Sequence, residues 1–170
     1  MSDKSKDKLK ICYDRLLPRD LAQPQRTMRS MRPDGVERAI IVFRKLWVNG
    51  SKLRVRFMGG TTTQQAIAKE QAQWWIQHAN LTFEFNNAPN AEIRVTFDPS
   101  DGAWSYIGTD CQSIPSNEPT MNLGFLDGGT AAHEFGHAIG LAHEHQNPDG
   151  GIERNEEVVL RDSSGPPNNW

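Results

Sequence analysis

The 170-residue sequence lacks the features that mark a membrane protein, a nucleic-acid-binding protein or a disulfide scaffold. No apolar run approaches the roughly 20 residues that cross a bilayer, and the first residues lack the apolar stretch of a signal peptide. A net charge of −2 gives no general attraction to phosphate backbones or anionic lipids, so neither nucleic acid nor membrane is expected as a partner. The only cysteines, Cys12 and Cys111, can form at most one bridge.

Histidine is scarce but concentrated in one place. Four of the five histidines fall within thirteen residues, at His133, His137, His143 and His145, and the fifth is His78 near the end of a predicted helix. Function is therefore expected in this window. His78 is interpreted as a helix or surface residue.

The chain divides into a basic arm over residues 1–37 and a domain over residues 38–170. The arm contains prolines and arginines but little apolar periodicity. Two interpretations stay open: a solvated tail lying over the domain surface, or an arm that reaches the active cleft in the manner of a pro-segment.

Apolar periodicity in the domain predicts an α+β (mixed α/β) fold. Helices are expected from Thr61 to about residue 79, with Trp74 and Trp75 packing in the core, and from an N-cap at Thr130 through the histidines. The segments 81–85 and 93–97 are expected to be neighbouring strands. Further strands are predicted at 39–43, 53–57, 104–107 and 121–126. Three loop aspartates are assigned to turns rather than to a calcium site: Asp98, Asp101 and Asp110.

The spacing of the histidines matches the geometry of one metal site. Residues four apart on a helix project from the same face, so His133 and His137 can bind one ion. His143 would face away if the helix continued, because six further residues turn it by about 240°. Gly140 stands where the helix must end, since glycine adopts a left-handed conformation without a Cβ penalty. The chain can then bring His143 back as a third ligand.

Three imidazoles leave one coordination position of a tetrahedral zinc ion open, which is the catalytic arrangement. Glu134 follows the first ligand and lies one step off the ligand face. It can reach a metal-bound water without binding the metal, as a general base must. No ligand spacing requires His145, which stays outside the predicted site.

The run 133–143 has the form His-Glu-x-x-His-x-x-Gly-x-x-His and resembles the signature of the metzincin zinc endopeptidases. Glu144 and the segment 120–124 resemble, more narrowly, astacin-like peptidases and their bacterial relatives. The resemblance implies a metzincin-like upper subdomain with a twisted, mostly parallel sheet, an antiparallel edge strand and two long helices, the second carrying the zinc motif. It also implies that the segment 104–107 is the edge on which an extended peptide substrate pairs.

The sequence departs from that family after the third ligand. Metzincins continue into a lower subdomain with a methionine turn, and astacin-like members add a tyrosine near it. Here 27 residues follow His143 and none is Met or Tyr. The lower C-terminal subdomain is therefore expected to be missing, which leaves the catalytic domain incomplete. Zymogens of related families place a pro-segment Cys or Asp on the zinc, and Cys12 or Asp14 is a candidate here although no surrounding motif matches.

The leading hypothesis is a zinc metalloendopeptidase that acts on peptide or protein substrates. His133, His137 and His143 hold Zn²⁺, and Glu134 is the general base. The alternative is a non-catalytic zinc-binding remnant or interaction module of a truncated metallopeptidase, and a third is a histidine-rich helix with no specific metal. Compartment and oligomeric state stay open.

Overall fold

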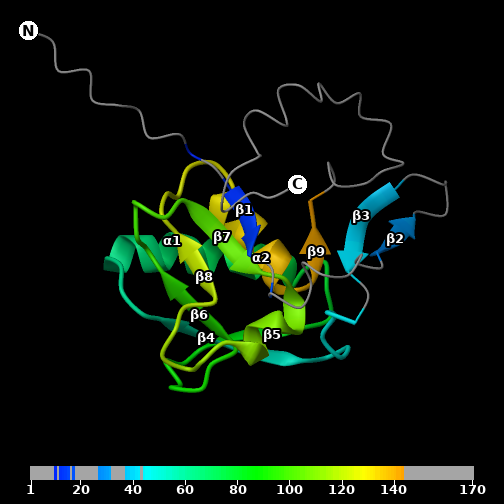
Figure 1. The fold of residues 1–170 in the computed structure, drawn as a ribbon, viewed down its shortest axis with the longest axis horizontal. Coiled ribbons are helices and arrows are strands. Elements are labelled where there is room, and N and C mark those ends of the chain that lie inside the picture. The colour runs from blue at the N-terminus through cyan, green and yellow to red at the C-terminus, as the bar shows by residue number, and fades with distance from the viewer. Residues whose placement is uncertain are drawn as a thin grey trace, which may run out of the picture.

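The computed structural model describes residues 10, 12–15, 17, 27–31, 37–42 and 44–143 (Figure 1). The main sheet has six strands in the spatial order β1 (Cys12–Arg15), β7 (Ala103–Tyr106), β8 (Met121–Leu123), β6 (Ile93–Thr96), β4 (Lys52–Phe57) and β5 (Thr82–Phe85). A smaller sheet has the order β2 (Thr27–Met31), β3 (Glu37–Val42) and β9 (Leu141–Ala142). The helices are α1 (Thr62–Trp75), α2 (Thr130–Ala138) and a short 3₁₀ helix at Gly108–Ser113.

The main sheet has the expected strand directions. β4 pairs in parallel with β5 and with β6, β6 pairs in parallel with β8, and β7 runs antiparallel to β8. The prediction of a mostly parallel sheet with an antiparallel edge strand, in a mixed α/β fold, is confirmed. The expected adjacency of the segments 81–85 and 93–97 is wrong, because β4 lies between β5 and β6. Period-2 alternation identifies a strand but does not choose its neighbour.

Helix α1 begins where the sequence predicts. The Thr61 hydroxyl accepts a bond from the Gln64 N–H at 3.2 Å, and the Gln64 side chain accepts one from the Thr61 N–H at 2.8 Å. This capping box satisfies two backbone donors that the helix itself leaves open. The helix ends at Trp75 and not near residue 79, since the backbone beyond it turns.

The tryptophans of α1 do not both pack in the core, contrary to the prediction. Trp74 is 48% exposed, whereas the buried face of the helix consists of Ala68 and Ala72. Alanines let α1 approach α2 closely, and Trp75 fills the space beside them, where its indole N–H donates to the Ala132 carbonyl at 2.6 Å. Close packing of the two helices, not the apolar period alone, decides which face is buried.

Both helices cover the same face of the main sheet. A single buried cluster joins side chains of both helices to alternate residues of four strands: Leu53, Val55, Ala68, Ala72, Phe83, Ile93, Val95, Met121, Leu123, Ala131, Phe135, Ala138 and Ile139. Alternation along each strand places these strand residues on one side. Within the described part of the chain, no helix is long and apolar enough to cross a membrane.

The smaller sheet ties the N-terminal region to the end of α2. Its strand β3 agrees with the strand predicted at 39–43, as far as the described residues reach. β3 pairs antiparallel with both β2 and β9. β1 and β2 lie within the 1–37 segment, so parts of the expected arm form regular strands.

The loop aspartates have partners within the protein. Asp98 accepts a bond from the Ser100 N–H at 2.8 Å, as in a turn, and the buried Asp110 pairs with Lys45 at 2.5 Å. Asp101 accepts bonds from Tyr13, Arg15 and Trp104. The Asp98 contact agrees with the assignment to turn structure, whereas Asp101 and Asp110 bind side chains of other segments.

Asn122 of β8 fastens the loop that precedes β7. Its side chain is fully buried and donates to the carbonyls of Asp98, Asp101 and Gly102 at 2.9, 3.3 and 2.7 Å. Its side-chain oxygen accepts bonds from the Asp98 N–H at 2.8 Å and from the Thr96 hydroxyl at 3.0 Å. The loop conformation therefore depends on one buried amide.

Replacing Asn122 should destabilise the fold. Asn122→Ala leaves several buried polar groups without a partner, so the free energy of unfolding should fall by about 2–4 kcal/mol. Urea unfolding followed by circular dichroism measures the change. The exposed Asn117 provides the matched control, and Asn117→Ala should shift the free energy by less than about 0.5 kcal/mol. Equal effects of the two variants would contradict this role of Asn122.

Candidate metal centre

Helix α2 presents His133 and His137 one turn apart. Their ring centroids are 4.6 Å apart, and their Nε2 atoms are 3.0 Å apart. The helix starts at the expected place, but its N-cap is Gly129 and not Thr130. Thr130 is the first helical residue, and its hydroxyl donates to the Asp127 carbonyl at 2.6 Å. The cap prediction is wrong by one residue, because Thr130 already lies within the helix and its hydroxyl bonds back to the preceding turn.

The chain leaves the helix at the predicted glycine. Gly140 has a φ of +113°, and its N–H donates to the His137 carbonyl at 2.9 Å. A Cβ at this position would lie 2.8 Å from the Leu46 Cδ2, so close packing adds to the backbone demand for glycine. β9 follows at once and pairs with β3, and this returns His143 to the side on which the helical histidines lie. The predicted break is confirmed.

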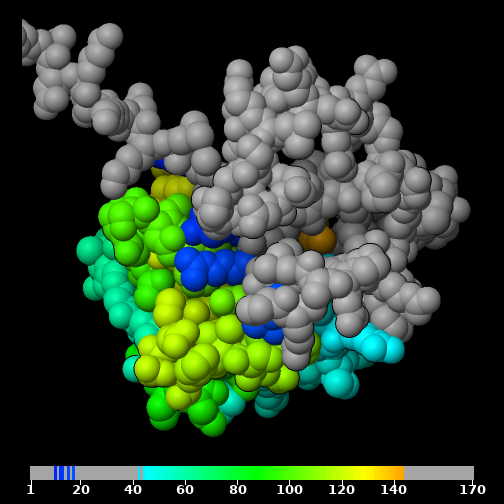
Figure 2. Space-filling model, in the orientation of Figure 1, coloured from blue at the N-terminus to red at the C-terminus, as the bar shows by residue number. Residues whose placement is uncertain are grey.

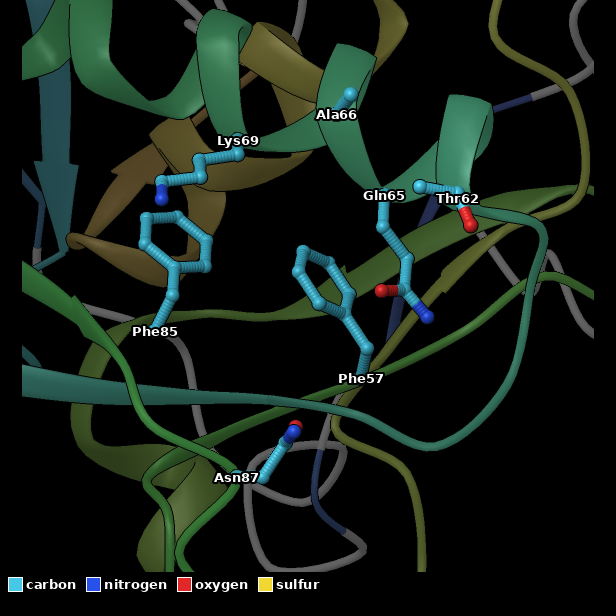
Figure 3. Close-up of a pocket in the computed structure, with 7 residues that line it drawn as sticks. All are labelled: Phe57, Thr62, Gln65, Ala66, Lys69, Phe85 and Asn87. Atoms are coloured by element: carbon cyan, nitrogen blue, oxygen red, sulfur yellow. The ribbon is translucent and has the colours of Figure 1, made fainter.

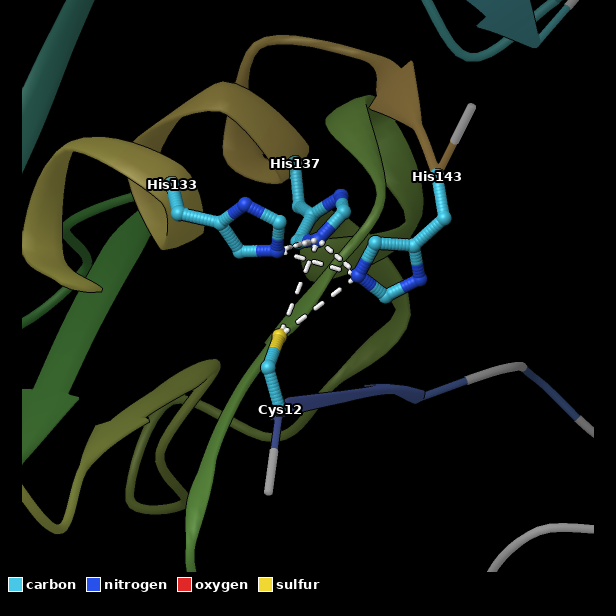
Figure 4. Close-up of side chains that lie close together, drawn as sticks. All are labelled: Cys12, His133, His137 and His143. Carbon is cyan, nitrogen blue, oxygen red and sulfur yellow. Dashed lines mark hydrogen bonds between the residues drawn. The ribbon is translucent and has the colours of Figure 1, made fainter. Parts of the chain in front are cut away.

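The three imidazoles converge on one point (Figure 4). Their Nε2 atoms are separated by 3.0 Å, 3.0 Å and 3.1 Å. Two nitrogens bound to one tetrahedral zinc ion at about 2.0–2.1 Å are about 3.3–3.4 Å apart. The observed spacings fall within a few tenths of an ångström of that value. The donor set therefore fits a zinc ion.

A backbone carbonyl orients the central imidazole. The Leu141 carbonyl lies 2.8 Å from the His137 Nδ1. A carbonyl can only accept, so Nδ1 carries the proton and Nε2 keeps its lone pair for a metal. Reasoning from the sequence did not find this contact, because it arises only when the chain turns back at Gly140.

Glu134 lies inside the protein next to the histidines. Its side chain is completely buried, and Oε1 accepts a bond from the Cys12 thiol at 2.8 Å. The structure thus places the expected general base beside the three imidazoles. His78 lies elsewhere, with its ring tilted by 51° against the Trp74 ring and the ring centroids 4.4 Å apart. His145, Glu144 and the rest of the chain after His143 lie outside the described residues.

Cys12 is the fourth member of the cluster. Its sulfur lies 3.6 Å from the His143 Nε2 and 4.0 Å from the His137 Nε2, and all four candidate ligand atoms lie within 4.8 Å of one another. A sulfur and a nitrogen on one tetrahedral zinc ion are separated by about 3.6 Å. From the sequence, Cys12 is only one of two candidates for a pro-segment ligand, beside Asp14. The residues around Cys12 do not predict the pairing of β1 with β7 that brings it to the histidines.

Strand β1 delivers Cys12 by pairing with the predicted substrate edge. β1 runs parallel to β7, with Cys12 opposite Ala103 and Arg15 opposite Tyr106. Figure 2 shows β1, in blue, at the surface of the domain. The edge expected at 104–107 exists as β7, and in this structure it is already occupied by a segment of the same chain.

The second cysteine is structural. Cys111 is 3% exposed, and burial raises the pKa of its thiol to about 12. A thiol with so high a pKa carries almost no thiolate near neutral pH and reacts slowly. No disulfide joins it to Cys12.

A surface cavity of about 290 Å³ lies away from the histidines (Figure 3). It lies between α1 and the β4–β5 side of the sheet, with lining residues Phe57, Thr62, Gln65, Ala66, Lys69, Phe85 and Asn87. β5 is the outer strand opposite the β1–β7 side of the sheet. None of the clustered residues Cys12, His133, His137 and His143 lines this cavity. The cavity is therefore not part of the candidate metal centre.

Comparison with known proteins agrees with this geometry. Solved structures of myroilysin superpose with TM-scores of 0.68 and 0.65, at 42% and 36% sequence identity. They cover 76% and 95% of this chain, which in turn covers 67% and 63% of theirs. Zinc metalloproteinase nas-20 of Caenorhabditis elegans is 28% identical in an alignment of 126 residues that covers 66% of this chain. Mouse tolloid-like protein 1 is 28% identical in an alignment of 125 residues that covers 72% of this chain.

The chain spans 32% of the length of nas-20 and 12% of that of tolloid-like protein 1. The family model for the astacin peptidases matches residues 41–162. That range contains both helices, β9 and all three clustered histidines. On this match, together with the metzincin-like sheet and the histidine geometry, the chain belongs to the astacin family of metallopeptidases.

Proposed function

We propose that this protein is a zinc-dependent endopeptidase. The observation that carries the proposal is the convergence of three Nε2 atoms within 3.1 Å of one another, beside the fully buried Glu134. Three imidazole lone pairs directed at one point are suited to binding a single cation. A carboxylate held at such a cation is placed to move protons.

His133, His137 and His143 would hold the metal, with His137 fixed in the required tautomer by the Leu141 carbonyl. Bound zinc would polarise the scissile carbonyl and acidify a water molecule. Glu134 takes the proton of the attacking water and delivers it to the departing amine nitrogen.

The backbone of β7 would bind the substrate as an additional strand. Main-chain hydrogen bonds to an exposed edge hold an extended peptide of varied sequence, as an endopeptidase requires. β1 occupies this edge over all four residues of β7. A peptide substrate can therefore bind only after β1 has left.

The position of Cys12 implies that the described form is latent. Three imidazoles and the Cys12 thiolate would fill all four positions of a tetrahedral zinc ion. The Cys12 sulfur lies 2.8 Å from the Glu134 Oε1, where a water molecule acted on by Glu134 would otherwise lie. Both the open coordination position and the general base are thereby blocked. This favours the interpretation of the 1–37 segment as an arm that reaches the active cleft.

The closed four-ligand set also supports the second candidate, a non-catalytic zinc-binding module, since structural zinc sites are closed in this way. The two candidates differ in what happens when Cys12 is removed. A latent peptidase becomes active, whereas a structural site loses affinity for its metal and gains nothing.

Removing the thiol should release peptidase activity. In zinc-loaded Cys12→Ala protein, the rate of cleavage of an unfolded protein substrate should rise by at least about tenfold over the unsubstituted chain, because the loss of about 1.4 kcal/mol of ligand binding already gives that factor. Gel electrophoresis of the digest measures the rate. Cys111→Ala is the matched control and should leave the rate unchanged. A Cys12→Ala protein that gains no activity and binds zinc more weakly than the unsubstituted chain would favour the zinc-binding module.

Activity released in this way should depend on Glu134. In the Cys12→Ala background, Glu134→Ala should lower the cleavage rate by about 10²–10⁴-fold, the usual contribution of a general base. Its zinc content, measured by mass spectrometry, should not change, since Glu134 is not among the proposed ligands. Glu84→Ala, at a partly exposed strand residue, serves as the control. Equal rates for the Glu134 and Glu84 variants would remove Glu134 from the mechanism.

Zinc content itself separates a specific site from a histidine-rich helix. His137→Ala should reduce bound zinc from about one ion per chain to a small fraction after dialysis against a weak chelator, because one of the three imidazoles is lost. His78→Ala removes a histidine outside the cluster and should leave the zinc content unchanged. If the His137 variant kept its zinc, the proposed ligand set would be wrong.

A further inference from the structure

The guanidinium group of Arg15 lies between an aromatic ring and a carboxylate on the sheet edge. Its central carbon is 3.7 Å from the centroid of the Trp104 ring, and one of its nitrogens donates to the Asp101 Oδ2 at 2.9 Å. Building on the proposed peptidase function, we propose that Asp101 and Trp104 form a subsite that selects a substrate arginine, with Arg15 filling it in the described form.

The domain builds this subsite independently of β1. The Trp104 indole N–H donates to the Asp101 Oδ2 at 2.8 Å and fixes the carboxylate beside the ring. The backbone of Asp101 is held in turn by the buried Asn122. The Trp104 ring meets the Tyr106 ring edge-to-face, with ring centroids 6.0 Å apart. The two recognition groups therefore have fixed orientations before any ligand arrives.

The contacts made by β1 are of a kind that a substrate can replace. Arg15 covers the indole face, and the Tyr13 hydroxyl donates to the Asp101 Oδ1 at 2.7 Å. When β1 leaves, an aromatic face and a carboxylate oxygen lose these contacts together. A substrate side chain that covers the Trp104 ring and donates to the Asp101 carboxylate restores both contacts. Substrates with such a side chain should therefore bind to β7 in preference to others.

The chemistry of the subsite favours arginine over other side chains. A guanidinium is planar, stacks on an aromatic face and still presents N–H groups to a carboxylate at the ring edge. A lysine ammonium is a compact charge that cannot make both contacts in the same way. A neutral side chain lacks the attraction to Asp101, and an acidic one is repelled by it.

The position of the subsite relative to the metal follows from strand alternation. Successive side chains of an extended strand point to opposite faces, so Cys12 points to the histidines while Tyr13 and Arg15 point to the Trp104 side. Three residues of strand span about 10 Å. A peptide on β7 would thus place its arginine within about three residues of the bond that is cleaved. Such remote contacts can contribute to cleavage as well as to binding.

The test uses the full chain with the Cys12 and Arg15 side chains of β1 shortened, as zinc-loaded Cys12→Ala/Arg15→Ala protein. Peptides of one sequence carry arginine, citrulline or lysine at each position within three residues of the scissile bond. Citrulline matches arginine in shape but has no charge. At one position, kcat/KM for arginine should exceed that for citrulline by about tenfold, with lysine between them. Adding Asp101→Asn should reduce the ratio to near one.

Two controls show whether the effect of Asp101→Asn comes from the lost charge at the subsite and not from unfolding or from the loss of any carboxylate. Asn at position 101 keeps an oxygen that can accept from the Trp104 indole, and urea unfolding verifies that the variant is folded. Asp127→Asn removes an exposed carboxylate that pairs with Lys10, and it should leave the arginine preference unchanged. Binding of the same peptides, labelled with a fluorophore, is measured by anisotropy on protein that also carries Glu134→Ala, so that recognition is observed without cleavage.

The outcomes separate this inference from the proposed function. Selective binding of arginine peptides that depends on Asp101, without cleavage of any peptide, would support the subsite and overturn the peptidase. Cleavage with equal rates for arginine and citrulline at every position would support the peptidase and overturn the subsite. A preference for arginine that survives Asp101→Asn would also overturn the subsite, because the selectivity would then come from another part of the protein.

Discussion

The turn at Gly140 is the constraint on which the rest of the site depends. Without it, His143 would continue around the helix axis and face away from His133 and His137. The left-handed glycine ends α2, lets β9 pair with β3, and places the Leu141 carbonyl where it fixes the His137 tautomer. One backbone conformation therefore decides the number of imidazoles at the centre, their direction and the protonation of one of them.

Local pattern was sufficient to predict the parts of the site that are local. The histidine spacing and the helix end at Gly140 depend on residues within a few positions of one another, and the structure agrees with them. The errors concern packing over longer distances. The order of β4, β5 and β6 and the exposure of Trp74 are decided by which surfaces meet, and neither strand alternation nor helix period carries that information.

Cys12 shows the same limit most clearly. It lies 121 residues before the first clustered histidine, in a segment whose composition predicts little beyond polarity. Its place at the cluster depends on four residues of β1 pairing with β7, and a four-residue strand has no periodicity strong enough to predict a partner. The surrounding residues match no known latency motif, so only the three-dimensional pairing identifies the contact.

The two faces of β1 give one short strand three different anchors. Its thiol lies at the histidine cluster, its backbone pairs with β7, and Arg15 lies between Trp104 and Asp101 on the opposite face. Each contact alone is weak. Because all three are on one strand, forming one of them raises the effective concentration of the other two, so β1 binds the domain more tightly than any single contact would allow. The same linkage makes release cooperative, because the loss of one anchor lowers the effective concentration of the other two. A substrate that offers an arginine and a free backbone edge competes with two of these anchors, whereas the thiol is the anchor that a peptide cannot replace. The proposed latency would therefore depend most on Cys12, and the proposed selectivity would depend most on the opposite face of β1, where Arg15 lies.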